Sequence, residues 1–224
     1  MKKITNDFIK YAKSMMSRTS VVDDVVKKVN DGYINPYILE ESTKNMATLD
    51  IFSKMLSDRN IIFGSAFDTD ICNVVLCQLL YLDSVSNQDI TIMINSPGGS
   101  VVDGLQVIDT INFIKSDVST MGLGMSASMG AVLLSCGKKG KRFVLPHSRV
   151  MIHQPSGGYR GTAKDAEIDF NMLMRCKDEL YRILAENCGK SIEEMEALCD
   201  RDNWFIGQEA VELGIVDKVI YSKE

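Results

Sequence analysis

Histidine is scarce in this chain, whose 224 residues include two histidines, four prolines and one tryptophan. Neither His147 nor His153 lies at a metal-ligand spacing from other ligand residues, so we expect no metal site. The phosphate-binding patterns G-x-G-x-x-G and G-x-x-x-x-G-K-[ST] are also missing. We therefore expect no nucleotide or other cofactor.

Long apolar runs and basic blocks are missing as well. No apolar run approaches the ~20 residues that a membrane-spanning helix needs. The net charge of −5, without a cluster of lysine and arginine, argues against nucleic acid as the main partner. The six cysteines include no C-x-x-C pair, which favours free thiols in a reducing compartment, and we expect a cytoplasmic protein.

What the chain does have is a regular alternation of strands and helices after residue 60. Strands are predicted at 60–64, 89–95, 118–124, 141–145 and 149–153. Helices are predicted at 68–81, 101–115 and 131–137. Such alternation is typical of an α/β domain with mainly parallel strands, and a chain of this length with 45% hydrophobic residues can bury its core.

The N-terminal segment differs from this domain. Residues 1–35 are polar, begin Met-Lys-Lys and lack the continuous apolar stretch of a secretory signal, so we predict a removable N-terminal extension. The main domain then spans 36–224 and opens with an extended piece at 37–41.

The C-terminal third also changes character. Residues 156–162 are rich in glycine and predict a flexible hairpin or an exposed strand, followed by a long helix at 163–187. This helix is apolar on more than one face, so its second face either meets another subunit or is buried within a large monomer. Helices at 191–200 and 207–213 and a closing strand at 215–221 complete the prediction.

The most informative stretch is Ala127–Val132, which places the hydroxyl of Ser128 between small residues where a strand turns into a helix. A serine at such a junction most often only caps the helix. It can also stand beside unpaired N–H groups, which is what an attacked carbonyl oxygen needs. A nucleophilic serine would require a base within reach and a third group that orients the base.

Candidates for these partners follow from residue type and position. His153 ends the strand at 149–153 and is favoured as the base over His147, because sites in α/β sheets collect at strand ends. The acid stays open among six carboxylates: Asp165, Asp169, Asp178, Asp200, Asp202 and Asp217. Gly98-Gly99 and the N–H of Met129 are candidates for an oxyanion hole, with a phosphate cradle as the competing interpretation.

Four motifs in one order are carried by the chain: Ile94–Gly99, Gly124–Ala131, Ser148–Pro155 and Asp200–Asp202. In sequence letters they read INSPGG, GMSASMGA, SRVMIHQP and DRD. This order closely resembles the ClpP family of ATP-dependent serine peptidase subunits, and the similarity runs from about Pro36 to Val219.

The resemblance implies roles for particular residues. Ser128 would be the nucleophile, His153 the general base and Asp202 the orienting acid, which excludes Ser126, His147 and Asp200 from the triad. Gly99 and Met129 would supply the oxyanion-hole amides. Substrate would bind as an added strand, with substrate-binding residues Gly98, Gly157 and Gly158.

The resemblance also implies an architecture and partners. The fold would be a crotonase-like ββα superhelix with a protruding helix–strand handle at about 156–187. Handles would join two seven-membered rings into a homo-oligomeric tetradecamer that encloses the active sites. A Clp-type AAA+ unfoldase, similar to ClpX or ClpC, would use the ATP and deliver unfolded polypeptides to this serine endopeptidase.

Departures from the family pattern and two rival functions remain. Met125 stands where many members have glutamine, and Thr91 and Met93 stand where relatives often present tyrosines to the unfoldase, so the docking surface is expected to differ.

One rival function is that of a catalytically idle ring component. The other is a crotonase-superfamily CoA enzyme, which would not need Ser128, His153 and an acid as a set.

Overall fold

The computed structural model describes residues 37–41 and 46–222, and the side chains from Asp50 onward. The predicted removable extension at 1–35 lies outside these residues. The chain divides into two compact units, Met1–Asp58 and Arg59–Glu224. In the described residues, no helix is both long and apolar enough to cross a membrane.

The first unit contains a small hairpin and a short helix. Strands β1 (Tyr37–Glu41) and β2 (Met46–Asp50) pair antiparallel, and α3 (Ile51–Ser57) follows at once. The carboxylate of Asp50 caps α3 by accepting hydrogen bonds from the backbone N–H groups of Phe52 and Ser53. The predicted extended piece at 37–41 is confirmed as β1, whereas the sequence analysis missed β2 and α3.

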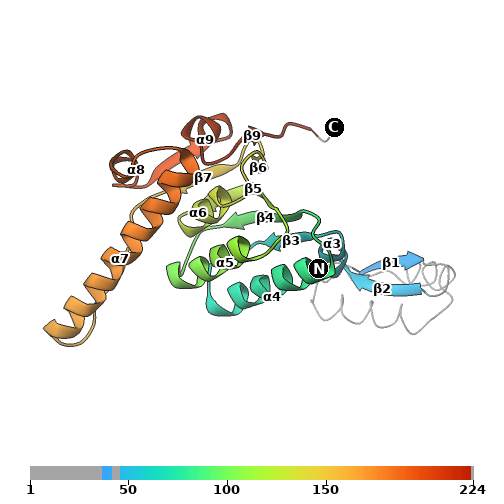
Figure 1. The fold of residues 1–224 in the computed structure, drawn as a ribbon, viewed down its shortest axis with the longest axis horizontal. Helices are drawn as coiled ribbons and strands as arrows, with labels where there is room; N and C mark the ends of the chain where they lie inside the picture. The colour runs from blue at the N-terminus through green and yellow to red at the C-terminus, as the bar shows by residue number, and fades with distance from the viewer. Residues whose placement is uncertain (1–36, 42–45, 223–224) are drawn as a thin grey trace, which may run out of the picture. The chain divides into compact units, whose positions relative to one another are not determined.

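The second unit is built on a seven-stranded mixed sheet, drawn from β3 to β9 in Figure 1. Its strands are β3 (Asn60–Phe63), β4 (Ile90–Ser96), β5 (Val118–Ala127), β6 (Arg142–Val144), β7 (Arg149–Ile152), β8 (Asn203–Ile206) and β9 (Lys218–Val219). All pairings are parallel except that of β7 with β8. The predicted α/β class with mainly parallel strands is confirmed.

Strand β5 is forked, because its two halves pair with different strands. Thr120–Gly122 pair with β6, and Met125–Ala127 pair with β7. The hydroxyl of Ser148, in the turn between β6 and β7, donates to the carbonyl of Gly122 at 2.7 Å and holds this turn against β5. The fork brings the end of β5 beside the end of β7.

Six helices complete the second unit: α4 (Thr69–Val85), α5 (Val101–Phe113), α6 (Met129–Ser135), α7 (Ala163–Cys188), α8 (Ile192–Leu198) and α9 (Gln208–Leu213). Asp68 and Ser100 cap α4 and α5, which pack against each other. Every residue of α6 is buried, and this helix packs on β5 and α7. The core lies between these helices and the alternate residues Ile90, Ile92 and Ile94 of β4, all 0% exposed.

Helix α7 projects away from the sheet at its N-terminal end (Figure 1). A capping box of Thr162 and Asp165 starts it, and Gly189 ends it in the left-handed region. Its C-terminal half is buried through Leu180 and Leu184, whereas Phe170 and Met172 near its free end are about half exposed, 49% and 50%. Burial within one monomer is therefore the wrong interpretation for this end of the helix.

Three predicted strands need correction. The glycines were expected to end the strand at 118–124, but β5 continues to Ala127. Gly124 takes a φ of +68°. The pairing of β5 with β4 shifts register here, and the side-chain oxygen of Asn95 accepts the Met125 N–H at 3.1 Å. The closing strand is only Lys218–Val219. Residues 156–162, predicted to form a flexible hairpin or an exposed strand, form no strand in the described chain.

Candidate active site

Ser128 occupies a strained position between β5 and α6. Its φ of 54° and ψ of −122° are unusual for a residue other than glycine. Its backbone N–H donates to the carbonyl of Met151 on β7 at 2.8 Å, which fixes the turn against that strand. Its side chain makes no capping hydrogen bond to α6, so the capping interpretation is wrong for this serine.

The hydroxyl of Ser128 instead contacts a histidine that contacts a carboxylate. His153 Nε2 lies 2.9 Å from Ser128 Oγ, and His153 Nδ1 lies 2.9 Å from Asp202 Oδ1. With the Nδ1 proton donated to Asp202, Nε2 is left to accept the serine proton; this tautomer is assigned from the hydrogen-bond network. A serine, a histidine and a carboxylate in this sequence of contacts are the constellation of a serine hydrolase.

The pairing of β7 with β8 explains why His153 and Asp202, which lie 49 positions apart in the sequence, meet here. Ile152 of β7 pairs with Asn203 of β8, so His153 directly follows one strand and Asp202 directly precedes the other. The fork in β5 places Ser128 at the same edge. The two side chains that orient each other differ in exposure, 25% for His153 and 64% for Asp202.

The Gly98-Gly99 turn lies directly against Ser128. A side chain at Gly98 would come within 2.6 Å of the Ser128 Cβ, and one at Gly99 would come within 2.4 Å of the Phe67 carbonyl oxygen. Both glycines have positive φ, 96° and 149°. Glycine is therefore required at Gly98 for the turn to approach Ser128 this closely, and at Gly99 for the turn to approach the main chain of Phe67.

Backbone hydrogen bonds hold that turn in place. Phe67 N donates to the carbonyl of Gly98 at 3.0 Å, and Ser100 N donates to the carbonyl of Phe67 at 2.9 Å. The amide of Gly98 donates to Ser96 Oγ at 3.2 Å. In the part of the chain that the structure describes, the N–H groups of Gly99 and Met129 donate to no backbone or side-chain acceptor. Two amides beside the hydroxyl are thus left for another acceptor.

A small apolar cavity of about 20 Å³ adjoins the serine. Its lining is Val101, Ser128, Met129, Val132, Ile152, His153, Pro155, Leu180 and Leu184. The walls come from the N-terminus of α5, from α6 and from the buried half of α7. The cavity is large enough for a small apolar group only.

The structure separates the candidates that the residue pattern left open. Ser126 is 0% exposed within β5, and its hydroxyl has no partner in the described residues. His147 lies in the turn before β7, and Asp200 faces Arg201 at 3.9 Å. Asp165 belongs to the capping box of α7, and Asp217 pairs with Arg142. Asp169 and Asp178 lie on α7 and take no part in the Ser–His–Asp contacts.

Two further predicted residues, Gly157 and Gly158, lie after Pro155 on an exposed segment. A side chain added at Gly157 would meet Leu173 of α7 at 3.6 Å, and one at Gly158 would meet nothing within 4 Å. Both therefore leave room for a ligand on the exposed side of the segment.

Cys136 and Cys199 are poor alternatives to the serine as nucleophiles. Burial raises the pKa of the thiols of Cys136 and Cys199 to about 12, so both stay protonated at neutral pH. The described residues also contain no group of three or more histidine, cysteine, aspartate or glutamate side chains that could hold a metal ion.

Sequence reasoning missed two residues that support the site. The main chain of Phe67 holds the Gly98-Gly99 turn, and nothing in the sequence pattern marks it. Gln154 donates to two carbonyl groups beside Asp202, Cys199 O at 2.6 Å and Asp200 O at 2.7 Å. Its place next to His153 in the SRVMIHQP motif was the signal that could have identified it.

Comparison with known proteins identifies the family and the relatives of this chain. A family model described as Clp protease matches residues 43–223. The chain is 50% identical over 219 residues to an ATP-dependent Clp protease proteolytic subunit of Bacteroides fragilis strain YCH46, covering 97% of this chain and all of the relative. It is 46% identical over 216 residues to the subunit of that description from Porphyromonas gingivalis W83, covering 96% and 97%.

These matches show that the chain belongs to the Clp protease family. Its function is that of a proteolytic subunit, and the enzyme is a serine peptidase. The resemblance identified from the four ordered motifs is confirmed, and neither rival function, the idle ring component or the CoA enzyme, is needed.

Proposed function

We propose that Ser128, His153 and Asp202 carry out the peptide-bond hydrolysis of this subunit. The observation that supports the proposal is the unbroken series of contacts from Ser128 Oγ through both ring nitrogens of His153 to Asp202, each of 2.9 Å. No other candidate serine, histidine or carboxylate among the described residues takes part in such a series.

The steps follow from this geometry. His153 Nε2 takes the proton of Ser128 as Oγ attacks the scissile carbonyl carbon. The N–H groups of Gly99 and Met129 donate to the oxyanion that forms, since neither has another acceptor among the described residues. His153 then gives its proton to the departing amine. In the second half of the reaction, His153 takes a proton from the water that attacks the acyl-enzyme and returns it to Ser128 Oγ as the acid product leaves. Asp202 stays ionised and holds the imidazole in the required tautomer.

Substrate is proposed to bind as an extended segment between the glycine-rich stretches. Gly98 on one side and Gly157 and Gly158 on the other present backbone without side-chain obstruction. Such binding uses main-chain hydrogen bonds and makes few demands on sequence. The apolar cavity beside Ser128 would take the side chain that precedes the scissile bond, and its small volume favours short apolar groups.

We also propose the assembly and partners that the family resemblance implies. The relatives are named as subunits of an ATP-dependent protease, and this chain would work with a Clp-type AAA+ unfoldase, ClpX- or ClpC-like, that delivers unfolded polypeptides in the cytoplasm. Exposed apolar residues support homo-oligomerisation, with Val102 60% and Phe113 80% exposed beside a cleft of about 710 Å³ between α5 and α7. A tetradecamer of two heptameric rings, joined through the α7 handle, would cover them.

The fold detail and domain limits belong to the same proposal. A crotonase-like ββα superhelix is consistent with the mixed sheet, and the peptidase domain would span 36–224 with its handle at about 156–187. Residues 1–35 would be removed as a propeptide. Thr91 and Met93, which lie on β4, would give the unfoldase a docking surface different from that of relatives with tyrosines.

Labelling with a fluorophosphonate tests the catalytic assignment. The reagent should modify one serine in the wild-type protein and none in Ser128→Ala, with peptide hydrolysis lost in parallel. Ser126→Ala is the matched control, because it removes a neighbouring hydroxyl for which the described residues offer no partner, and labelling should persist. Undiminished labelling of Ser128→Ala would refute the assignment.

A further inference from the structure

Asp202 is poorly fixed by its own side-chain contacts. The side chain is 64% exposed, and within the described residues its carboxylate accepts one hydrogen bond, from His153 Nδ1. Exposed pairs of this kind contribute little to holding two side chains in one geometry. The position of the acid must therefore come from the main chain that carries it.

That main chain is held on both sides of Asp202. On its C-terminal side, the pairing of β7 with β8 fixes Asn203 opposite Ile152, the last pair of the ladder. On its N-terminal side, the ladder has ended, and Gln154 takes over with two hydrogen bonds. Its backbone N–H donates to Cys199 O at 2.6 Å, and its side-chain Nε2 donates to Asp200 O at 2.7 Å.

The turn before Asp202 also has an internal bond. Asn203 Nδ2 donates to Leu198 O at 3.1 Å and closes residues 198–203 into a single turn. This bond keeps the shape of the turn but does not attach it to the strand of the base. The two donors of Gln154 make that attachment, because Gln154 directly follows His153 in the chain.

We propose that Gln154 is a positioning residue for the proteolytic reaction, whose side-chain amide holds the Asp200–Asp202 segment so that Asp202 faces His153 Nδ1. The proposal rests on the proposed role of Asp202 as the orienting acid. Without the Nε2 donor, the carbonyl of Asp200 would turn to solvent. The Asp202 side chain would then no longer be held in one position beside the end of the β7–β8 ladder. Displacements of about 1 Å at a catalytic centre cost on the order of 10²-fold in rate.

The test uses Gln154→Leu and Gln154→Glu, which both remove the donor and differ in polarity. We expect each to lower kcat for a fluorogenic peptide about 10- to 100-fold with little change in KM. Gln208→Leu is the matched control, because Gln208 is exposed at the start of α9 and should leave kcat unchanged. A kcat within twofold of wild type in both Gln154 variants would overturn the proposal.

A double-mutant cycle separates positioning from a general structural effect. If Gln154 acts through Asp202, Gln154→Leu should lower the rate less than twofold further when Asp202→Asn is already present. The rate of fluorophosphonate labelling of Ser128 serves as the readout where turnover is slow. The same 10- to 100-fold loss in both backgrounds would overturn the proposal, whereas full activity of Asp202→Asn alone would instead refute the assigned acid.

Discussion

Two carboxylates of this molecule, Asp217 and Asp202, are held in opposite ways. Asp217 accepts hydrogen bonds from the N–H of Gly140 and from the N–H, Nε and Nη2 of Arg142, at 2.6 to 3.0 Å. Asp202 accepts one hydrogen bond within the described residues and is mostly exposed. Asp217 is held by the hydrogen bonds that its carboxylate oxygens accept, whereas Asp202 is held by the backbone on either side of it.

The difference follows from the partner that each carboxylate serves. The Arg142 side chain is only 4% exposed, and a buried guanidinium is tolerated only when its charge is compensated and its donors are satisfied. The remaining Arg142 donor, Nη1, reaches the carbonyl of Asn187 at 2.9 Å and ties the end of α7 to β6. Asp217 therefore serves the fold. Asp202 contacts one imidazole, and its exposed carboxylate faces water.

The largest effect should come from Asp202→Asn. Because an asparagine amide favours the wrong tautomer of the imidazole, kcat should fall about 10⁴-fold. The melting temperature should hardly change, since the side chain is exposed and has one partner in the described chain. Peptide hydrolysis and calorimetry on one preparation measure both. A large loss of stability with retained turnover would reverse the contrast between the two carboxylates.

Asp217→Asn should show the opposite pattern. The change leaves Arg142 buried without its counter-charge, which typically costs about 3–5 kcal/mol in the free energy of unfolding. Turnover of the folded fraction should stay near wild type. Asp89→Asn is a suitable control, because Asp89 also pairs with a cation, Lys141, but its side chain is 53% exposed. Equal destabilisation by both variants would show that burial is not the deciding factor.

The smallest effect is expected in the pH dependence of stability. Burial by itself raises the pKa of Asp217, but the hydrogen bonds and charge of Arg142 outweigh it and leave that pKa below its usual value of 3.8. The carboxylate therefore stabilises the fold fully above its unfolded pKa, and this contribution is lost as the pH falls through the lower, folded value.

Denaturant unfolding of wild type and Asp217→Asn from pH 7 down to pH 3 measures this contribution. The difference in the free energy of unfolding should stay constant down to about pH 4 and shrink below it. A difference that shrinks already between pH 7 and pH 5 would show that another group titrates.

Much of the fold could be predicted from local pattern. The apolar residues at helical spacing identified α4 and α5, and the β-branched run at Ile90, Ile92 and Ile94 identified β4. Strand β8 was missed. Its residues alternate between half-buried and exposed, with Trp204 44% exposed, so neither face of the strand belongs to the buried core. It is a strand because it pairs with β7, and such pairing is not visible in a single segment.

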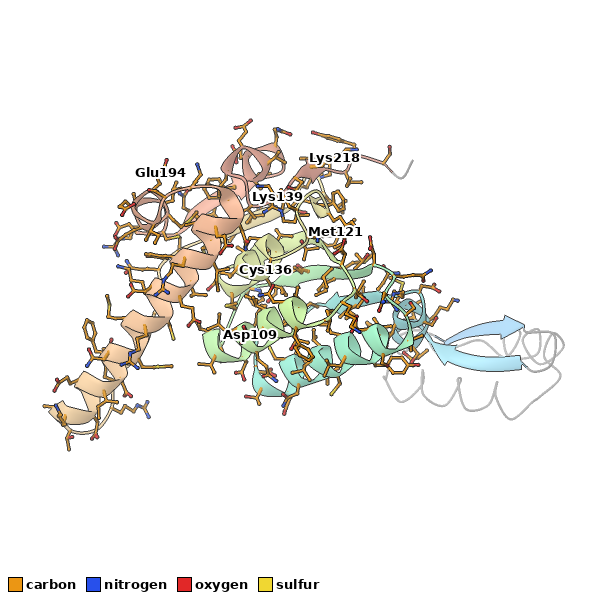
Figure 2. All side chains as sticks on the ribbon, viewed as in Figure 1. Asp109, Met121, Cys136, Lys139, Glu194 and Lys218 are labelled. Atoms are coloured by element: carbon orange, nitrogen blue, oxygen red, sulfur yellow. The ribbon has the colours of Figure 1, made fainter. Side chains whose placement is uncertain are left out.

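The candidate site shows the same limit. Local pattern placed Ser128 at a strand–helix junction and His153 at a strand end, and both placements are confirmed. The choice of Asp202 among six carboxylates came from the family resemblance, because the antiparallel ladder that brings it to His153 depends on β8. Which residues around α7 stay exposed could not be foreseen either. Figure 2 shows side chains standing free along its projecting end.

The hydrogen bond from Ser128 N to Met151 O has a mechanical consequence. It fastens Ser128 to β7 only two residues before His153, so a small rotation or shift of that strand would carry both residues together. Asp202 arrives from a different segment, which the β7–β8 ladder and the two donors of Gln154 attach to the same strand.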